Sequence, residues 1–163
     1  MPESPALSGA EAETWASFYA MRRRLDRALD LQLQRDSGLS ASEYEVLQAV
    51  SLAPDRQLRI KEIAGAIGWE KSRVSHLVTR MEKRGFVSRT ECPSDARGSW
   101  IGLTASGRRS ILGAMRGHSE AIRRYFFDVL TAEDATVIEA LSGRVVEAIG
   151  CGHDEDVDPA QSA

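Results

Sequence analysis

Several features that mark large classes of proteins are scarce or absent in this chain of 163 residues. Its two cysteines, Cys92 and Cys151, are too few for a disulfide scaffold, which favours a reducing compartment. No apolar run reaches the roughly 18 to 20 residues that a membrane span requires. The N-terminal sequence MPESPALSGAEAE is acidic and lacks the basic and then apolar order of a signal peptide. We therefore expect a soluble cytoplasmic protein.

Motifs for catalysis are also missing from the sequence. There is no Gly-rich phosphate loop, no nucleophile elbow and no HExxH pair. The histidines His76, His118 and His153 do not form a close pair, and His153 lies in an acidic tail that would attract metal ions only loosely. We expect no enzymatic activity, no cofactor and no metal site.

What the sequence does have is an uneven distribution of charge. The chain carries a net charge of −3, yet residues 56–109 contain 12 Lys and Arg against 5 acidic residues, a charge of +7. The rest of the chain contains 9 basic and 19 acidic residues, a charge of −10. A basic segment inside an acidic protein is typical of a nucleic-acid-binding face, although a solvated charged surface gives the same count.

Two predicted helices in the basic segment, 61–67 and 70–84, are separated by Gly68, which suits a tight turn. This order is typical of a helix-turn-helix. In the second helix the apolar residues fall on one stripe, and the opposite side carries Ser, Thr, His, Arg and Lys. Such a face suits a DNA major groove, where Arg or Lys donates to guanine N7 and O6. An ordinary amphipathic surface helix has the same pattern.

The stretch ECPSDARGSW follows this helix between two predicted strands, 86–90 and 99–103, and we expect a β-hairpin with a long loop. Arg97 would enter a narrow minor groove, and Asp95 would orient its guanidinium by a two-point contact. The alternative is a surface hairpin with a weak ion pair. A hairpin directly after a helix-turn-helix favours a DNA-binding wing.

These patterns define the candidate site. The residues that we predict to contact DNA are Lys71, Ser72, Arg73, Ser75, His76, Thr79, Arg80, Lys83, Asp95 and Arg97, with Ser72, Arg73 and His76 best placed for the bases. Phosphate contacts are expected from Arg56, Lys61, Arg89 and Arg108.

Three blocks of the sequence resemble the MarR family of bacterial winged-helix regulators. They are LSASEYEVLQAVS, then RIKEIAGAIGWEKSRVSHLVTRMEKRGFVSR, then DARGSWIGLTASGR, and together they span roughly Gly38 to Arg109. The resemblance implies dimers with interleaved terminal helices, a recognition helix in a major groove and a wing beside a minor groove. It also implies repression of a nearby gene, and release of DNA when a small phenolic, acidic or lipophilic molecule binds.

Two positions depart from the family pattern. The wing often carries Asp-x-Arg-Arg, whereas Gly98 stands here in place of the second arginine, so the wing has one charge fewer. The recognition helix usually starts at a Ser or Thr cap. Glu70 takes that place here, a poorer cap whose charge nevertheless favours the positive end of the helix dipole.

Apolar residues near the C-terminus support the expectation of a homodimer, with packing inside one subunit as the alternative. They are Tyr125, Phe126, Val129, Val137, Leu141, Val145 and Ile149. In chain order we predict a disordered N-terminus (1–9), a dimerisation helix (10–37), a winged helix-turn-helix region (38–103), further dimerisation helices (104–150) ended by Gly150, and an acidic disordered tail (151–163).

Three hypotheses stay open at this level. An effector pocket would be lined by Trp15, Tyr19, Arg22 and Tyr44, which suit an aromatic carboxylate. The alternative, which we favour, is that the three aromatics are core residues. Cys92 is expected to be an inert thiol rather than an oxidant sensor, because Glu91 beside it would raise its pKa. The alternative functions are an activator without ligand response and a winged-helix module for protein contacts, which the basic segment disfavours.

Overall fold

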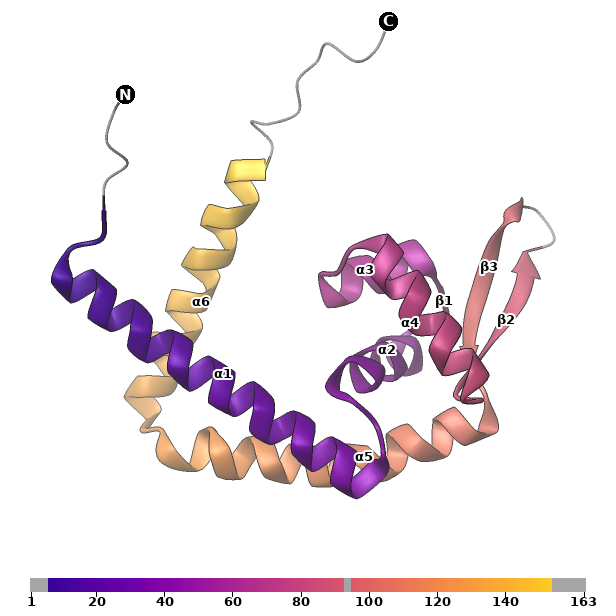
Figure 1. Ribbon diagram of the computed structural model, residues 1–163, viewed down its shortest axis with the longest axis horizontal. Coiled ribbons are helices and arrows are strands. Elements are labelled where there is room, and N and C mark those ends of the chain that lie inside the picture. The colour runs from indigo at the N-terminus through magenta and orange to yellow at the C-terminus, as the bar shows by residue number, and fades with distance from the viewer. Residues whose placement is uncertain (1–5, 93–94, 154–163) are drawn as a thin grey trace, which may run out of the picture. The chain divides into compact units, whose positions relative to one another are not determined.

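The computed structural model describes residues 6–92 and 95–153, and for residues 91, 92, 95–98 and 151–153 it describes the backbone alone. The chain divides into two compact units, one up to Ile122 and one from Arg123 onward. The first unit holds α1 to α4, the three strands and most of α5, and the second holds η1 and α6 (Figure 1). Among the described residues, no helix is long and apolar enough to span a membrane.

The first helix, α1 (Gly9–Ser37), begins one residue before its predicted start. The Ser8 side chain accepts from the backbone N–H of Glu11, whose carboxylate in turn accepts from Ser8. The helix ends at Gly38, which has a left-handed φ of 69° and donates its N–H to the carbonyl of Gln34. A glycine is favoured there because a Cβ strains that conformation.

The second helix, α2 (Ala41–Leu52), begins with a capping box. Ser40 and Glu43 satisfy each other's backbone N–H groups, at 3.0 Å and 3.3 Å. Leu39 and Tyr44, on either side of the cap, are both buried. The helix ends two residues before Pro54, and its inner face forms the centre of the hydrophobic core.

The predicted helix-turn-helix is present as α3 (Ile60–Ile67) and α4 (Lys71–Lys83). Gly68 lies between them with a φ of 67° and donates to Ala64. Ile63 of α3 and the stripe of α4 are buried in the same core. The four residues of the α4 stripe are Val74, Leu77, Val78 and Met81.

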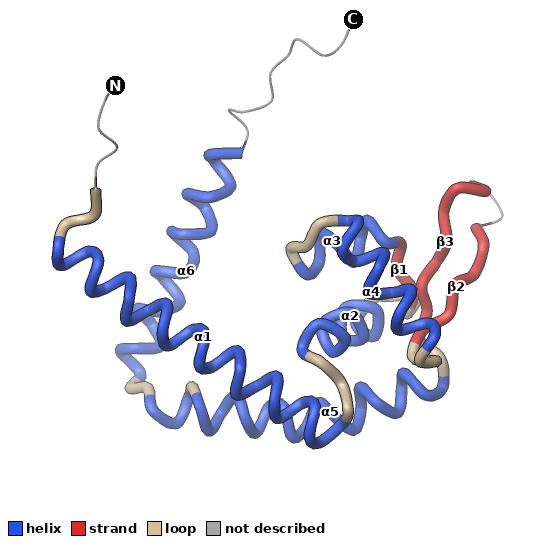
Figure 2. Tube along the Cα trace, viewed as in Figure 1, coloured by secondary structure: helices blue, strands red, loops and turns tan. Residues whose placement is uncertain are grey.

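The strands form an antiparallel sheet in the order β1-β3-β2, with β1 at Gln57–Arg59, β2 at Val87–Cys92 and β3 at Asp95–Leu103 (Figure 2). Leu58 pairs with Ile101, and Val87 with Leu103. The sequence prediction of a long loop was wrong, because the strands continue through most of that stretch. Backbone pairing does not need apolar side chains, and a register shift at Glu91/Cys92 absorbs the irregularity.

The start of α5 (Ala105–Tyr125) is locked against the end of the helix-turn-helix. Thr104 donates its hydroxyl to the carbonyl of Gly85 at 2.6 Å and accepts from the N–H of Gly107 at 3.0 Å. A Cβ built on Gly107 would lie 1.9 Å from the carbonyl oxygen of Phe86. Only glycine therefore allows this close approach of backbone to backbone.

The C-terminal elements correct the predicted helix end at Gly150. The helix α5 ends at Tyr125, and a short 3-10 helix, η1 (Phe127–Val129), follows. The next helix, α6 (Ala132–His153), passes through Gly150 instead of ending there. A glycine inside a helix costs only about 1 kcal/mol, which does not force a stop. Thr131 caps α6 through Asp134.

Candidate nucleic-acid interface

The outer face of α4 gathers the predicted contact residues of the recognition helix. The stripe of α4 is buried, so the remaining positions turn outward by helix geometry. Exposed are Lys71, Ser72, Arg73, His76, Thr79, Arg80 and Lys83, and Ser75 is half-buried. Glu70 makes no side-chain cap hydrogen bond, in agreement with its expected weakness as a cap.

A tryptophan that sequence reasoning overlooked supports one of these residues. The guanidinium carbon of Arg73 lies 3.4 Å from the ring centroid of Trp69, so the two groups are stacked. Trp69 follows Gly68 in the turn, donates its N–H to the carbonyl of Ala64 and is packed against the core. The signal in the sequence is the spacing of four between the two residues, which is easily missed because Trp69 precedes the helix.

Arg73 also influences a carboxyl group on α2. Burial raises the pKa of Glu45, and the positive charge of Arg73 partly opposes that rise. Arg73 thus contacts an indole of the turn and acts electrostatically on an acid of α2.

On the other flank of α4, Arg89 of β2 is tied to the helix. It donates to the hydroxyl of Thr79 at 2.8 Å, and its Nε lies 3.1 Å from a carboxylate oxygen of Glu82. Thr79 in turn donates to the carbonyl of Ser75 at 2.9 Å. The hydroxyl hydrogen of Thr79 is therefore occupied within the chain, and a phosphate contact by Arg89 would compete with these partners.

The C-terminal end of α4 is anchored by Arg84. Its guanidinium pairs with the carboxylate of Glu43 at 2.5 Å and donates to the carbonyl of Gly38 at 3.0 Å. Glu43 is buried, and it also caps α2. One arginine thus joins the end of the recognition helix to the end of α1 and the start of α2.

The wing strands carry the remaining predicted residues. Asp95 and Arg97 lie on β3, and Cys92 lies on β2, but their side chains are outside the described atoms, so the predicted Asp95–Arg97 contact and the state of the Cys92 thiol stay predictions. At the sheet's other edge, the guanidinium of Arg59 lies 5.0 Å from the Trp100 ring centroid.

The expected phosphate-binding cations occupy the ends of several elements. Arg56, with a φ of 51°, is in the turn before β1. Lys61 lies in the first turn of α3 and Arg108 in the first turn of α5. All three are exposed.

The four predicted effector-pocket residues do not form one group within the chain. Trp15 and Tyr19 stack on α1 at 6.1 Å between ring centroids, and Arg22 lies over Tyr19 at 5.5 Å. Tyr44 is buried beside His118, at 4.6 Å between the rings. Tyr19 is 18 residues from the end of α1, so it lies about 27 Å along the helix from the end nearest Tyr44.

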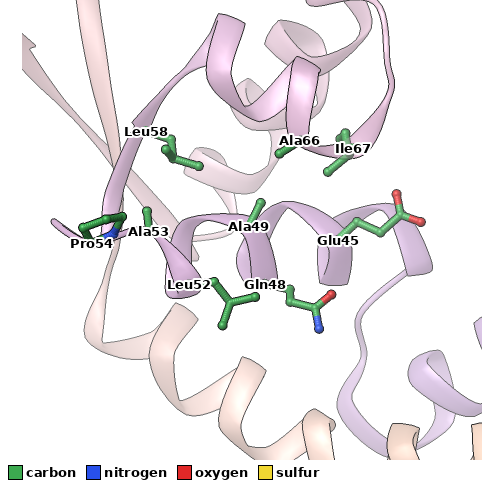
Figure 3. A pocket seen from close by; sticks show the side chains of 9 residues that line it. All are labelled: Glu45, Gln48, Ala49, Leu52, Ala53, Pro54, Leu58, Ala66 and Ile67. Atoms are coloured by element: carbon green, nitrogen blue, oxygen red, sulfur yellow. The ribbon is translucent and has the colours of Figure 1, made fainter. Parts of the chain in front are cut away.

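An open pocket of about 560 Å³ lies elsewhere, between α2, α3 and β1 (Figure 3). Its lining is mostly apolar, with the Glu45 carboxylate and the Gln48 amide as its polar groups. The lining residues are Glu45, Gln48, Ala49, Leu52, Ala53, Pro54, Leu58, Ala66 and Ile67. None of the predicted effector-pocket residues is among them. Across the described residues, no cluster of His, Cys, Asp and Glu could hold a metal ion.

Residues 37–98, which contain the whole of α4, match the model described as MarR family. The fold is similar to Sco3205, a MarR family transcriptional regulator from Streptomyces coelicolor whose crystal structure is of a complex with DNA. The identity is 36%, the match covers 91% of this chain and 92% of that one, and the TM-score is 0.85. This chain belongs to the MarR family.

Two further comparisons agree with membership of the MarR family. AbsC, another MarR family transcriptional regulator from Streptomyces coelicolor, is 32% identical over 90% of this chain and 98% of that one, with a TM-score of 0.83. The transcriptional regulator HosA from Escherichia coli O111:H- is 27% identical over 68% of this chain and 79% of its own length. The predicted family and the mainly α winged-helix fold are confirmed. MarR proteins are transcriptional regulators and not enzymes.

Proposed function

We propose that this MarR family protein binds a pseudo-palindromic DNA operator as a homodimer, represses transcription there and responds to a small molecule. The observation that carries the DNA-binding part is α4, whose apolar stripe is buried while seven polar and basic residues are exposed. The similar regulator Sco3205 was crystallised with DNA, which supports the same partner for this chain. A helix of this kind places its N-terminal residues against base edges in a major groove.

The homodimer is supported by apolar side chains that the single chain leaves exposed. On α6, Val137, Leu141, Val145 and Ile149 are between 46% and 62% exposed, and on α1, Trp15 and Phe18 are 57% and 45% exposed. A second copy would cover apolar surface that is costly to leave in water. Two recognition helices would then contact half-sites about 34–36 Å apart.

Repression and ligand response are the finer parts of the proposal. A dimer spanning an operator would exclude polymerase from an overlapping promoter. An activator without ligand response is the alternative. For an acidic aromatic effector, the α1 group of Trp15, Tyr19 and Arg22 is better suited than the α2–α3 pocket, because the Glu45 carboxylate would repel an anion.

The first test is a fluorescence anisotropy titration with the DNA upstream of its own gene and with random DNA of equal length, at two salt concentrations. We expect tight binding of one dimer per site, with affinity falling steeply as salt rises. Binding that ignored salt would favour the protein-interaction alternative. Salt-sensitive binding without preference for any sequence in a random pool would contradict an operator-binding function.

The wing is tested with Arg97→Ala. We expect operator binding to weaken by about 1–3 kcal/mol. Unchanged affinity at physiological salt would remove Arg97 from the interface.

The effector is tested with a salicylate-like acid, which is expected to raise the melting temperature and weaken operator binding. Failure of both effects would exclude this class of effector.

A further inference from the structure

The contacts of Trp69 give it a function beyond packing. We infer that Trp69 is a positioning residue for base recognition, whose indole holds the guanidinium of Arg73 in the orientation from which Arg73 contacts a guanine in the major groove. The inference rests on the proposed function, since it names how one residue of the operator-binding helix achieves specificity.

The first argument is the geometry of the stack. The separation of 3.4 Å between the Arg73 guanidinium carbon and the Trp69 centroid is van der Waals contact of a planar cation on an aromatic face. The N–H donors of a guanidinium lie in its plane. Stacking covers one face of the group and leaves the donor edge available for the O6 and N7 acceptors of guanine.

The second argument is the rigidity of the platform. Trp69 is held by its backbone hydrogen bond to Ala64, by the left-handed turn at Gly68 and by contact of its side chain with the core. A free arginine has high rotamer entropy that binding must remove. Stacking on a fixed indole removes part of that entropy before DNA arrives, so more of the contact energy appears as affinity.

The third argument is the position of Arg73 along the helix. It is the third residue of α4, in the first turn, from which recognition helices reach base edges. Arg80 lies about two turns further along on the same flank and has no such aromatic support among the described contacts. The contact with Trp69 therefore distinguishes Arg73 from Arg80.

The experiment begins with an operator selected by the wild-type protein from random DNA. Affinities are then measured for that operator, for each single-base-pair variant and for random DNA. We expect Arg73→Ala to lose discrimination at one G·C pair by about 5- to 150-fold. Trp69→Leu, which keeps an apolar side chain on the core, should reduce discrimination at that same pair by about 2- to 5-fold.

Three controls separate positioning from packing. Trp69→Phe, which keeps an aromatic face, should recover part of the discrimination, and in the Arg73→Ala background Trp69→Leu should have no further effect at that pair. Trp100→Leu removes the second Arg–Trp contact found among the described residues and should leave discrimination at that pair unchanged. Affinity for random DNA and its salt dependence should stay the same in the Trp69 variants. If Trp69→Leu lowers the melting temperature, the test of positioning uses Trp69→Phe and the double-mutant cycle of Trp69→Phe with Arg73→Ala instead.

The outcomes distinguish failure of this inference from failure of the proposed function. The inference is overturned if Trp69→Leu or Trp69→Phe weakens binding to all DNA by one common factor. It is also overturned if Arg73→Ala alters no base-pair preference while the wild type still selects an operator, a result that leaves the proposed function intact. If the wild type selects no sequence, the proposed function fails first.

Discussion

The core of the winged-helix region and the helix α6 of this MarR family chain differ in how far their apolar residues are buried. In the winged-helix region, Leu47, Val74 and Ile101 are fully buried. They belong to a core to which α1 to α5 and the sheet contribute side chains. In α6, no side chain described between residues 132 and 150 is buried. We therefore expect the first region to fold on its own contacts, and we propose that the surface of a second copy stabilises α6.

The largest expected effect comes from charging the exposed face of α6. Leu141→Glu with Val145→Glu places two acids on the face that the homodimer would bury. We expect a monomer in analytical ultracentrifugation at micromolar concentration. Operator affinity should fall by about 100-fold or more, because the second half-site is lost.

The matched control for this variant is Leu52→Glu, since Leu52 is 74% exposed but belongs to the winged-helix region. It should leave the dimer intact. A double variant of α6 that stayed dimeric would contradict the comparison between the two regions.

The next largest effect is expected at the close contact between Gly107 and Phe86 in the packed region. Gly107→Ala would force a methyl group to within 1.9 Å of the Phe86 carbonyl oxygen, so the start of α5 must shift. We expect the free energy of unfolding to fall by about 3 kcal/mol or more, measured by urea denaturation.

Gly113→Ala, in the same helix with open space around it, is the control. It should stabilise the protein by about 0.5–1 kcal/mol, because alanine is a better helix former. Equal effects of the two variants would show that the close contact at Gly107 does not matter.

A smaller loss is expected from Arg84→Ala. The substitution leaves the buried Glu43 carboxylate without its cation, although water can reach the half-exposed site of Arg84. The free energy of unfolding should fall by about 1–3 kcal/mol. Arg116→Ala removes an exposed ion pair with Glu120 and should cost less than about 0.5 kcal/mol. Similar losses in both variants would show that burial of Glu43 adds nothing.

The smallest effect concerns His118, where α5 meets α1 and α2. Its Nδ1 lies 3.1 Å from the Gln32 side-chain oxygen, and burial lowers its pKa. Because the folded pKa lies below the usual value of about 6.5, the unfolded chain binds more protons between the two values. This part of the stability is present above the usual value and is lost as the pH falls through the folded pKa.

Urea denaturation at several pH values between 7.5 and 5 measures this loss. In His118→Gln the decrease in stability with falling pH should be smaller than in the wild type. Identical pH profiles of the two proteins would rule out His118 as a contributor.

Local rules in the sequence determined much of the fold and of the candidate site. The capping box of Ser40 and Glu43, the glycine turn at Gly68 and the apolar stripe of α4 each depend on residues a few positions apart. Such signals are complete within one segment, so the recognition helix and its exposed face could be predicted. The family blocks added the dimer and effector expectations, which stay proposals.

The tertiary structure decided two kinds of feature. One is contact between residues that are far apart in the sequence, and the other is how far a strand or helix continues along the backbone. Three such contacts form only when the elements pack together. They are the ion pair of Arg84 with Glu43, the hydrogen bond from Arg89 to Thr79 and the close approach of Gly107 to Phe86. The extension of the wing strands and the continuation of α6 through Gly150 depend on backbone hydrogen bonding, which composition specifies weakly. The sequence determined which face of each helix is apolar, and tertiary packing decided which of those faces a single chain buries.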